Sequence, residues 1–148
     1  MNVREMAGHV IRRLNQHSTQ VFALGAQRAG FDLTPVQFAA MDTIAANPGI
    51  DQAGVAAHIA YDRATIGGVI DRLEQKGYVS RNVSPQDRRR RAVWLTDQGE
   101  AILQDILPVV TNLQETMLPG LEPAERARFL ELAGKALGAF GKGEEKKP

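Results

Sequence analysis

The chain has 148 residues, of which 43% are hydrophobic and 24% are charged, enough to bury the core of one compact domain. The composition excludes a disordered chain, a collagen and a coiled-coil array, and the absence of cysteine excludes disulfides, thiolate-bound metals and thiol redox sensing. The formal net charge is +1, so the total points to neither a strongly acidic nor a strongly basic partner.

The N-terminal residues do not resemble a targeting or membrane segment. Arg4, Glu5, Arg12 and Arg13 fall where a signal peptide would be apolar. No apolar run approaches the roughly 20 residues that a membrane-spanning helix needs. We therefore expect a cytoplasmic protein that does not bind a membrane.

Two helices are predicted in the first third of the chain. Apolar side chains recur at steps of three or four over residues 3–29, which is typical of an amphipathic helix. A second helix should begin after Thr34, because Pro35 suits the first helical position and Gln37 can complete a capping box with Thr34. We expect this helix to end near Ala46, before a Pro-Gly pair.

Two shorter helices follow and predict a helix-turn-helix. Asp51 can cap a helix over residues 52–59, and Asp62 can cap a fourth helix that ends at Gly77. The side of the fourth helix that repeats at i, i+3, i+4 and i+7 is apolar and comprises Ile66, Val69, Ile70 and Leu73. The opposite side, which is free for a partner, carries Ala64, Thr65, Gly68, Asp71 and Arg72.

A β-hairpin with a basic tip is predicted next. Residues 78–83 and 92–95 are β-prone, and a Ser-Pro pair and four consecutive arginines lie between them. Residues 61–96 hold eight Lys and Arg against four Asp and Glu, a local balance of +4 that leaves −3 for the rest. Such a segment suits a polyanion such as nucleic acid, although a solvated basic loop is the usual explanation of a charge run.

The remaining residues predict two long helices and a short tail. Thr96 can cap a fifth helix that Pro108 should kink, and a sixth follows Pro123. We expect an N-terminal dimerisation helix (1–33), a DNA-binding domain (34–96), C-terminal dimerisation helices (97–141) and a flexible tail (142–148). The apolar stripes of the first, fifth and sixth helices must be buried against another surface, and a second copy of the chain is the simplest partner.

Two stretches of the sequence resemble the multiple-antibiotic-resistance regulator (MarR) family. Asp87-x-Arg89-x-x-x-Val93-x-Leu95-Thr96, followed by Gly99, is similar to the wing signature of that family, and residues 70–81 are similar to its recognition-helix end and first wing strand. The resemblance covers nearly the whole chain. It implies a mainly α fold with a small β-hairpin wing, in which a winged helix-turn-helix domain and a helical dimerisation domain form a homodimer.

The resemblance also implies a function and an interface. The function is that of a DNA-binding transcriptional regulator, a repressor that binds a palindromic operator in double-stranded DNA. The helix from Asp62 would enter the major groove, with its first residues Arg63, Ala64 and Thr65 leading. The wing would place Arg89, or one of its neighbours, in or beside a minor groove. Those neighbours are Arg88, Arg90 and Arg91.

The roles of four further residues around this interface are predicted less directly. Asp87 would support the wing by orienting an arginine or by pairing with Arg72, and Arg72 is equally a candidate for DNA contact and for a structural ion pair. Gly67 and Gly68 each cost roughly 1 kcal/mol in a helix. We expect packing to explain Gly67 and close approach to DNA to explain Gly68.

A ligand site is suggested by the first helix. His9, Arg13 and His17 recur at i, i+4 and i+8, and such a stripe could hold an anion. Members that control breakdown of aromatic acids are the most similar, which implies a small aromatic carboxylate of the hydroxybenzoate, hydroxycinnamate or hydroxynicotinate type. Its ring would lie against Phe38 and Met41. The alternative is that the stripe belongs to the dimer interface or the surface.

Other classes of function have little support in the sequence. The three histidines lack metal-ligand spacing with carboxylates, so no metal is expected, and no cofactor-binding loop or catalytic set is evident. We therefore predict no enzymatic activity and no cofactor. The main alternative is a winged-helix module that binds RNA or a protein without small-molecule control.

Overall fold

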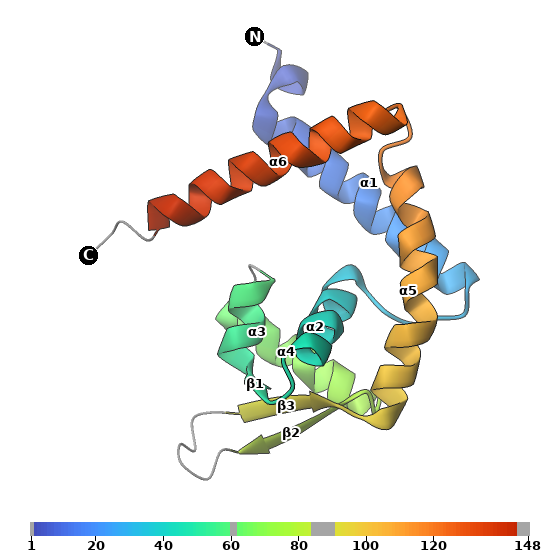
Figure 1. The fold of residues 1–148 in the computed structure, drawn as a ribbon, viewed down its shortest axis with the longest axis vertical. Coiled ribbons are helices and arrows are strands. Elements are labelled where there is room, and N and C mark those ends of the chain that lie inside the picture. The colour runs from blue at the N-terminus through green and yellow to red at the C-terminus, as the bar shows by residue number, and fades with distance from the viewer. Residues whose placement is uncertain (1, 60–61, 84–90, 145–148) are drawn as a thin grey trace. The chain divides into compact units, whose positions relative to one another are not determined.

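The structure is a computed structural model that describes residues 2–59, 62–83 and 91–144 (Figure 1). It forms two compact units, residues 1–113 and 114–148, which are described separately. The elements in chain order are the 3-10 turn η1 (Val3–Glu5), α1 (Ala7–Arg28), α2 (Pro35–Ala46), β1 (Ile50–Asp51), α3 (Gln52–His58), α4 (Arg63–Gln75), β2 (Val79–Val83), β3 (Arg91–Leu95), α5 (Asp97–Met117) and α6 (Pro123–Glu144).

The helix starts follow the predicted capping residues. The Thr34 hydroxyl accepts a hydrogen bond from the Gln37 backbone N–H (3.2 Å), and the Gln37 side-chain oxygen accepts one from the Thr34 backbone N–H (3.2 Å). Asp51 caps α3 by accepting from the Gly54 N–H (2.7 Å), and Asp62 caps α4 by accepting from the Ala64 N–H (3.1 Å). These bonds satisfy backbone donors that have no partner inside their own helix, so the predicted helix boundaries hold to within a few residues.

The sheet has three strands, one more than the predicted hairpin. β3 lies in the middle, with β2 antiparallel on one side and the two-residue β1 antiparallel on the other. Ile50 pairs with Val93, and Arg81 pairs with the same residue from the other side. β1 therefore joins the start of the helix-turn-helix to the wing.

The core of the first unit lies between α2, α3, α4 and the sheet. The predicted apolar side of α4 is buried, because Ile66, Ile70 and Leu73 have at most 1% of their surface exposed. Met41 and Val93 are fully buried against the same interior. This packing turns the polar side of α4 outward.

Large apolar side chains remain exposed outside this core, on the N-terminal residues and on α1, α5 and α6. α1 buries only Phe22 and Ala26, both near its C-terminal end. α5 continues through Pro108, and α6 extends to Glu144, three residues beyond the predicted end of the C-terminal helices at residue 141. The large hydrophobic side chains that remain exposed are Val3, Met6, Val10, Ile11, Leu24, Leu107, Phe129, Leu130, Leu132 and Leu137.

Within the described ranges, none of the helices combines the length and apolar character needed to cross a membrane.

Candidate nucleic-acid interface

The outward side of α4 carries the residues that the sequence assigned to it. Ala64, Thr65, Gly68 and Arg72 are all exposed, and they lie on one side because they are spaced at helical intervals. The Thr65 hydroxyl lies 3.4 Å from an Asp62 carboxylate oxygen, at the start of the helix. The backbone of Arg63 forms the first residue of α4, whereas its side chain lies outside the described part of the structure.

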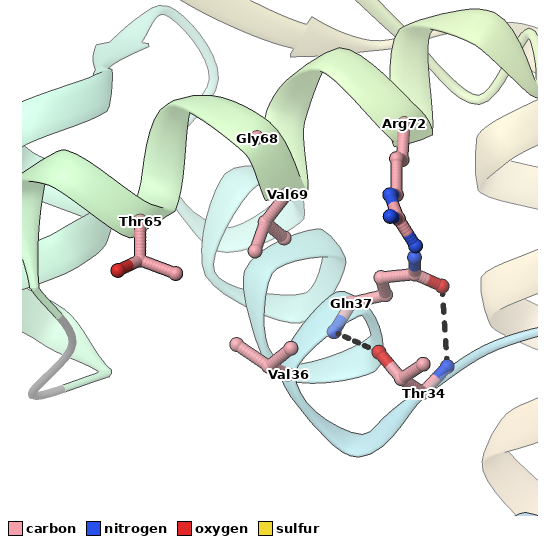
Figure 2. A pocket seen from close by; sticks show the side chains of 7 residues that line it. All are labelled: Thr34, Val36, Gln37, Thr65, Gly68, Val69 and Arg72. Carbon is pink, nitrogen blue, oxygen red and sulfur yellow. Dashed lines mark hydrogen bonds between the residues drawn. The ribbon is translucent and has the colours of Figure 1, made fainter.

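A surface pocket of about 270 Å³ lies between this side of α4 and the N-terminal turn of α2 (Figure 2). Its walls combine hydroxyl, amide and guanidinium groups with two valines. The lining residues are Thr34, Val36, Gln37, Thr65, Gly68, Val69 and Arg72. Three predicted DNA-contacting residues therefore share one concave surface, and none of the predicted ligand-binding residues lines it.

Packing against the described residues does not explain the two glycines of α4. A Cβ at Gly67 would meet only the Gln52 side-chain nitrogen, at 3.8 Å, which is an ordinary contact. The prediction that packing explains Gly67 is therefore wrong for the described residues. A Cβ at Gly68 would meet nothing within 4 Å, so its side of the pocket is open space.

Arg81 on β2 is the centre of a charged cluster that sequence reasoning did not find. Its guanidinium contacts the Asp71 carboxylate (2.6 Å) and both Glu74 oxygens (3.0 and 3.3 Å), and it donates to the Gln52 side-chain oxygen (3.0 Å). The hydrogen bond from Arg81 lowers the pKa of Glu74, and the same contact raises the pKa of Arg81. Arg81 is one of the eight basic residues counted in residues 61–96, but Asp71 and Glu74 compensate its charge within the domain.

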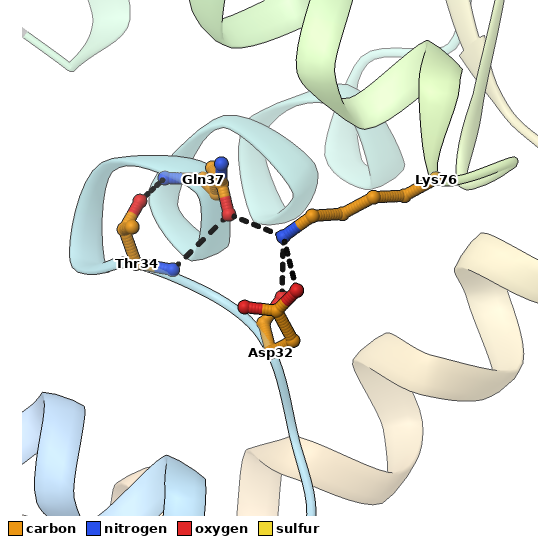
Figure 3. Close-up of polar contacts among 4 residues, drawn as sticks. All are labelled: Asp32, Thr34, Gln37 and Lys76. Atoms are coloured by element: carbon orange, nitrogen blue, oxygen red, sulfur yellow. Dashed lines mark hydrogen bonds and ion pairs between the residues drawn. The ribbon is translucent and has the colours of Figure 1, made fainter.

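Lys76 makes a second internal contact, at the C-terminal end of α4 (Figure 3). Its ammonium donates to the Asp32 backbone carbonyl (2.6 Å) and to the Gln37 side-chain oxygen (3.2 Å), and it lies 3.4 Å from the Asp32 carboxylate. Gln37 is 4% exposed and is the one polar residue buried in the described core. Lys76 thereby ties α4 to the segment that joins α1 and α2.

The wing tip falls outside the described residues. Asp87, Arg88, Arg89 and Arg90 all belong to that segment. Arg91 begins β3 and is exposed. Arg72 forms no ion pair with any other residue that the structure describes, so its proposed pairing with Asp87 stays a prediction.

The predicted ligand residues are placed in two groups. The first group, His9, Arg13 and His17, lies along α1. Arg13 is exposed and the two histidines are half-buried. A ring nitrogen of His9 lies 3.0 Å from the Arg12 guanidinium. Phe38 on α2 packs its ring against Phe22, with centroids 5.9 Å apart. Phe22 lies nine residues beyond Arg13 on α1, roughly 13 Å along the helix axis.

The sequence holds a local signal for the Arg81 cluster but none for the pocket between α4 and α2. Asp71 and Glu74 are three residues apart, so they share one side of α4, and a basic partner on a neighbouring strand is an ordinary way to satisfy them. The pocket residues of α2 gave no such signal, because the pocket depends on how two helices pack.

The fold and the exposed side of α4 define a winged helix-turn-helix protein, a class whose second helix enters the major groove of a duplex. Comparisons with known proteins identify its family. Residues 33–90 match the MarR family. The transcriptional regulator HosA of Escherichia coli O111:H- is 36% identical over 139 residues, which are 94% of this chain and 100% of HosA. The chain therefore belongs to the MarR family of transcriptional regulators, and it is not an enzyme.

Two solved structures are similar over most of the chain. One is BpsR of Bordetella bronchiseptica, whose DNA binding is regulated by 6-hydroxynicotinic acid. It has a TM-score of 0.82 and is 29% identical to this chain. That match covers 92% of this chain and 96% of the BpsR chain. The transcriptional repressor CouR, bound to a 23-mer DNA duplex, has a TM-score of 0.81 and 26% identity over 91% of this chain and 94% of the other.

Proposed function

We propose that this chain is a repressor that binds a palindromic operator as a homodimer and leaves it when a small aromatic acid binds. The observation that carries the proposal is the exposed outward side of α4, which bears Thr65 and Arg72, in a chain that is similar along most of its length to a repressor bound to duplex DNA. A two-fold dimer would offer two copies of this surface to two half-sites.

The proposed DNA contacts divide between two grooves. Arg63, Ala64 and Thr65 would approach the bases of the major groove, and Arg72 would reach a base or a phosphate along the same helix. The open space at Gly68 would let the DNA come close to the helix backbone. At the wing, Arg88, Arg89, Arg90 and Arg91 would meet the minor groove or its phosphates, with Asp87 orienting one of them.

The proposed effector is a planar aromatic carboxylate, and its site would involve α1 and α2. BpsR, which responds to a hydroxylated pyridine carboxylate, supports this class of ligand. The carboxylate would pair with Arg13 or with one of the two predicted histidines, His9 or His17. Its ring would lie against Phe38 and Met41.

The proposed link between ligand binding and release is a change in the packing around this site. Met41 has 0% of its surface exposed, and Phe38 packs on Phe22 of α1, so a ring could reach both only if the packing around these two side chains opened. Ligand binding would then select a state in which the two winged domains no longer match consecutive major grooves. A ligand that binds both states equally would not release the DNA.

Fluorescence anisotropy tests the proposal directly. A labelled duplex from the region upstream of the gene would be bound by the protein and then titrated with hydroxylated benzoates, cinnamates and pyridine carboxylates. We expect one of these classes to release the DNA, and we expect Arg13→Ala to lose the response while keeping its affinity for the duplex. Arg28→Ala, which alters another exposed arginine of α1, is the matched control. A full response in Arg13→Ala would remove Arg13 from the site.

A further inference from the structure

Arg81 is placed on the inner side of the wing by the strand register. It pairs with Val93, which is fully buried, and paired residues in an antiparallel sheet point to the same side. Its neighbours on β2, Ser80 and Asn82, are exposed. The side chain of Arg81 is therefore directed toward the helices, and only 15% of it is exposed.

The contacts of Arg81 occupy all three nitrogens of its guanidinium. Nε donates to Glu74, Nη1 donates to Gln52, and Nη2 contacts both Glu74 and Asp71. The planar group has a fixed fork of donors, so these partners determine where it lies. With its donors engaged and its surface largely covered, Arg81 has little left to offer a phosphate.

These partners come from both helices of the helix-turn-helix. Gln52 begins α3, and Asp71 and Glu74 lie on the last two turns of α4. β2 belongs to the wing, and it lies at the edge of the described sheet, paired with β3. Among the described residues, Arg81 therefore connects the wing by its side chain to the helix that would read the major groove.

We propose that Arg81 is a positioning residue that fixes the wing relative to α4, so that both can engage one duplex at the same time. The inference rests on the proposed DNA-binding function and adds a residue that acts through others. Losing the contact would let the wing shift relative to α4, while the buried Val93 keeps its strands on the domain and the outward side chains of α4 stay in place. Arg81 would thus determine how far the footprint extends on each half-site.

The first arm of the test uses the free protein and requires no DNA. Amide hydrogen exchange would be compared between wild type, Arg81→Gln and Arg81→Lys. We expect exchange in β2 and β3 to rise by about tenfold or more in Arg81→Gln and by less in Arg81→Lys, with the amides of α2 unchanged. Arg128→Gln on α6, which removes an exposed arginine paired with Glu131 at 3.0 Å, is the matched control. Unchanged exchange in the wing strands would overturn the proposal.

The second arm maps the complex by hydroxyl-radical footprinting on a duplex selected by the wild-type protein from a random pool. Arg81→Gln should lose the outer protection, which the wing provides, and keep the central protection, which α4 provides, with a loss in affinity of about tenfold. Outer protection that persists would overturn the proposal. Loss of central and outer protection together in a folded variant would also overturn it, because Arg81 would then act on α4 itself.

A triple variant separates positioning from charge compensation. In Arg81→Gln/Asp71→Asn/Glu74→Gln no carboxylate is left unpaired by the loss of the arginine. We expect the triple variant also to lose the outer protection of the duplex, because the guanidinium that holds the wing strand against α3 and α4 is still missing. Recovery of the outer protection would overturn the proposal in favour of simple neutralisation. If the wild type protects no duplex, the proposed DNA binding fails, while the exchange experiment still decides the role of Arg81.

Discussion

At the scale of single residues, Gly99 has the least room for a side chain among the described glycines. It lies in the first turn of α5, where the Thr96 hydroxyl accepts from the Gly99 N–H (3.0 Å) and the Thr96 N–H donates to the Tyr78 carbonyl (3.0 Å). A Cβ at Gly99 would overlap the backbone of Tyr78. The glycine that follows the wing signature thus has a packing role, because it lets α5 begin against the wing.

We predict that Gly99→Ala destabilises the protein by about 2–3 kcal/mol or more, because the obstacle is backbone and cannot rotate away. Urea unfolding at neutral pH measures the effect. Gly134→Ala on α6 is the matched control, since a Cβ there meets nothing within 4 Å, and it should be neutral or slightly stabilising. Equal effects of the two substitutions would contradict the packing role.

Gly67 and Gly68 form a natural pair for separating stability from DNA contact. Both have room for a methyl group, so alanine at either position should stabilise α4 by about 1 kcal/mol. We predict that only Gly68→Ala also weakens operator binding, because Gly68 is exposed on the outward side. Thermal unfolding and anisotropy titrations measure the two effects. Unchanged operator affinity in Gly68→Ala would leave the close approach unsupported.

Glu74 makes the stability of the domain depend on pH. Because the hydrogen bond from Arg81 lowers its pKa in the folded state, the contribution of Glu74 is complete above its unfolded pKa and is lost as the pH falls through the folded value. We predict that the free energy of unfolding falls more between about pH 7 and pH 4 in wild type than in Glu74→Gln. Glu131→Gln, which removes the partner of Arg128, is the control, and it should retain the wild-type dependence. Parallel curves for wild type and Glu74→Gln would refute this.

At the scale of elements, Lys76 joins the end of α4 to the start of α2. Its ammonium supplies a hydrogen bond to the buried Gln37 oxygen, whose other donor among the described residues is the Thr34 N–H. We predict that Lys76→Met destabilises the protein by about 1–2 kcal/mol and speeds amide exchange in the first turn of α2. Lys135→Met on α6 is the control, because Lys135 is exposed. If both variants behave alike, the contact contributes nothing.

Elements that depend on local chemistry were predictable from the sequence. The capping residues Thr34, Asp51 and Asp62 placed the starts of three helices, because a cap acts on backbone groups within three residues. β1 was missed because it has two residues and is defined by pairing with β3, some 40 positions away. Its existence depends on the assembled domain.

The candidate site was predictable in its outline and not in its internal contacts. The helical period placed Thr65, Gly68 and Arg72 on one side of α4, and the structure has them there. The same period cannot say that Arg81 points inward, because that depends on the register of β2 against β3. Counting charges therefore overestimated the positive charge available to a partner.

At the scale of the whole molecule, the exposed apolar side chains of α1 and α6 predict an interface with another chain. Ile11 is 65% exposed and Leu137 is 72% exposed in the single chain. Exposed side chains of this kind, gathered on two long helices, are typical of an interface. We predict a dimer by sedimentation at micromolar concentration, and Ile11→Glu should weaken it, whereas Gln20→Glu on the opposite side of the same helix should not. A wild-type monomer would contradict the proposed assembly.

The most direct test of the whole account is an anisotropy titration with two duplexes of equal length. One carries the palindrome that the wild-type protein selects, and the other carries the same bases in scrambled order. We predict tight binding to the palindrome, with two chains per duplex, an affinity that falls steeply as salt increases, and release by an aromatic carboxylate. Equal affinity for the two duplexes, or tighter binding to single-stranded RNA of the same sequence, would contradict the central claim that this chain is an operator-binding regulator.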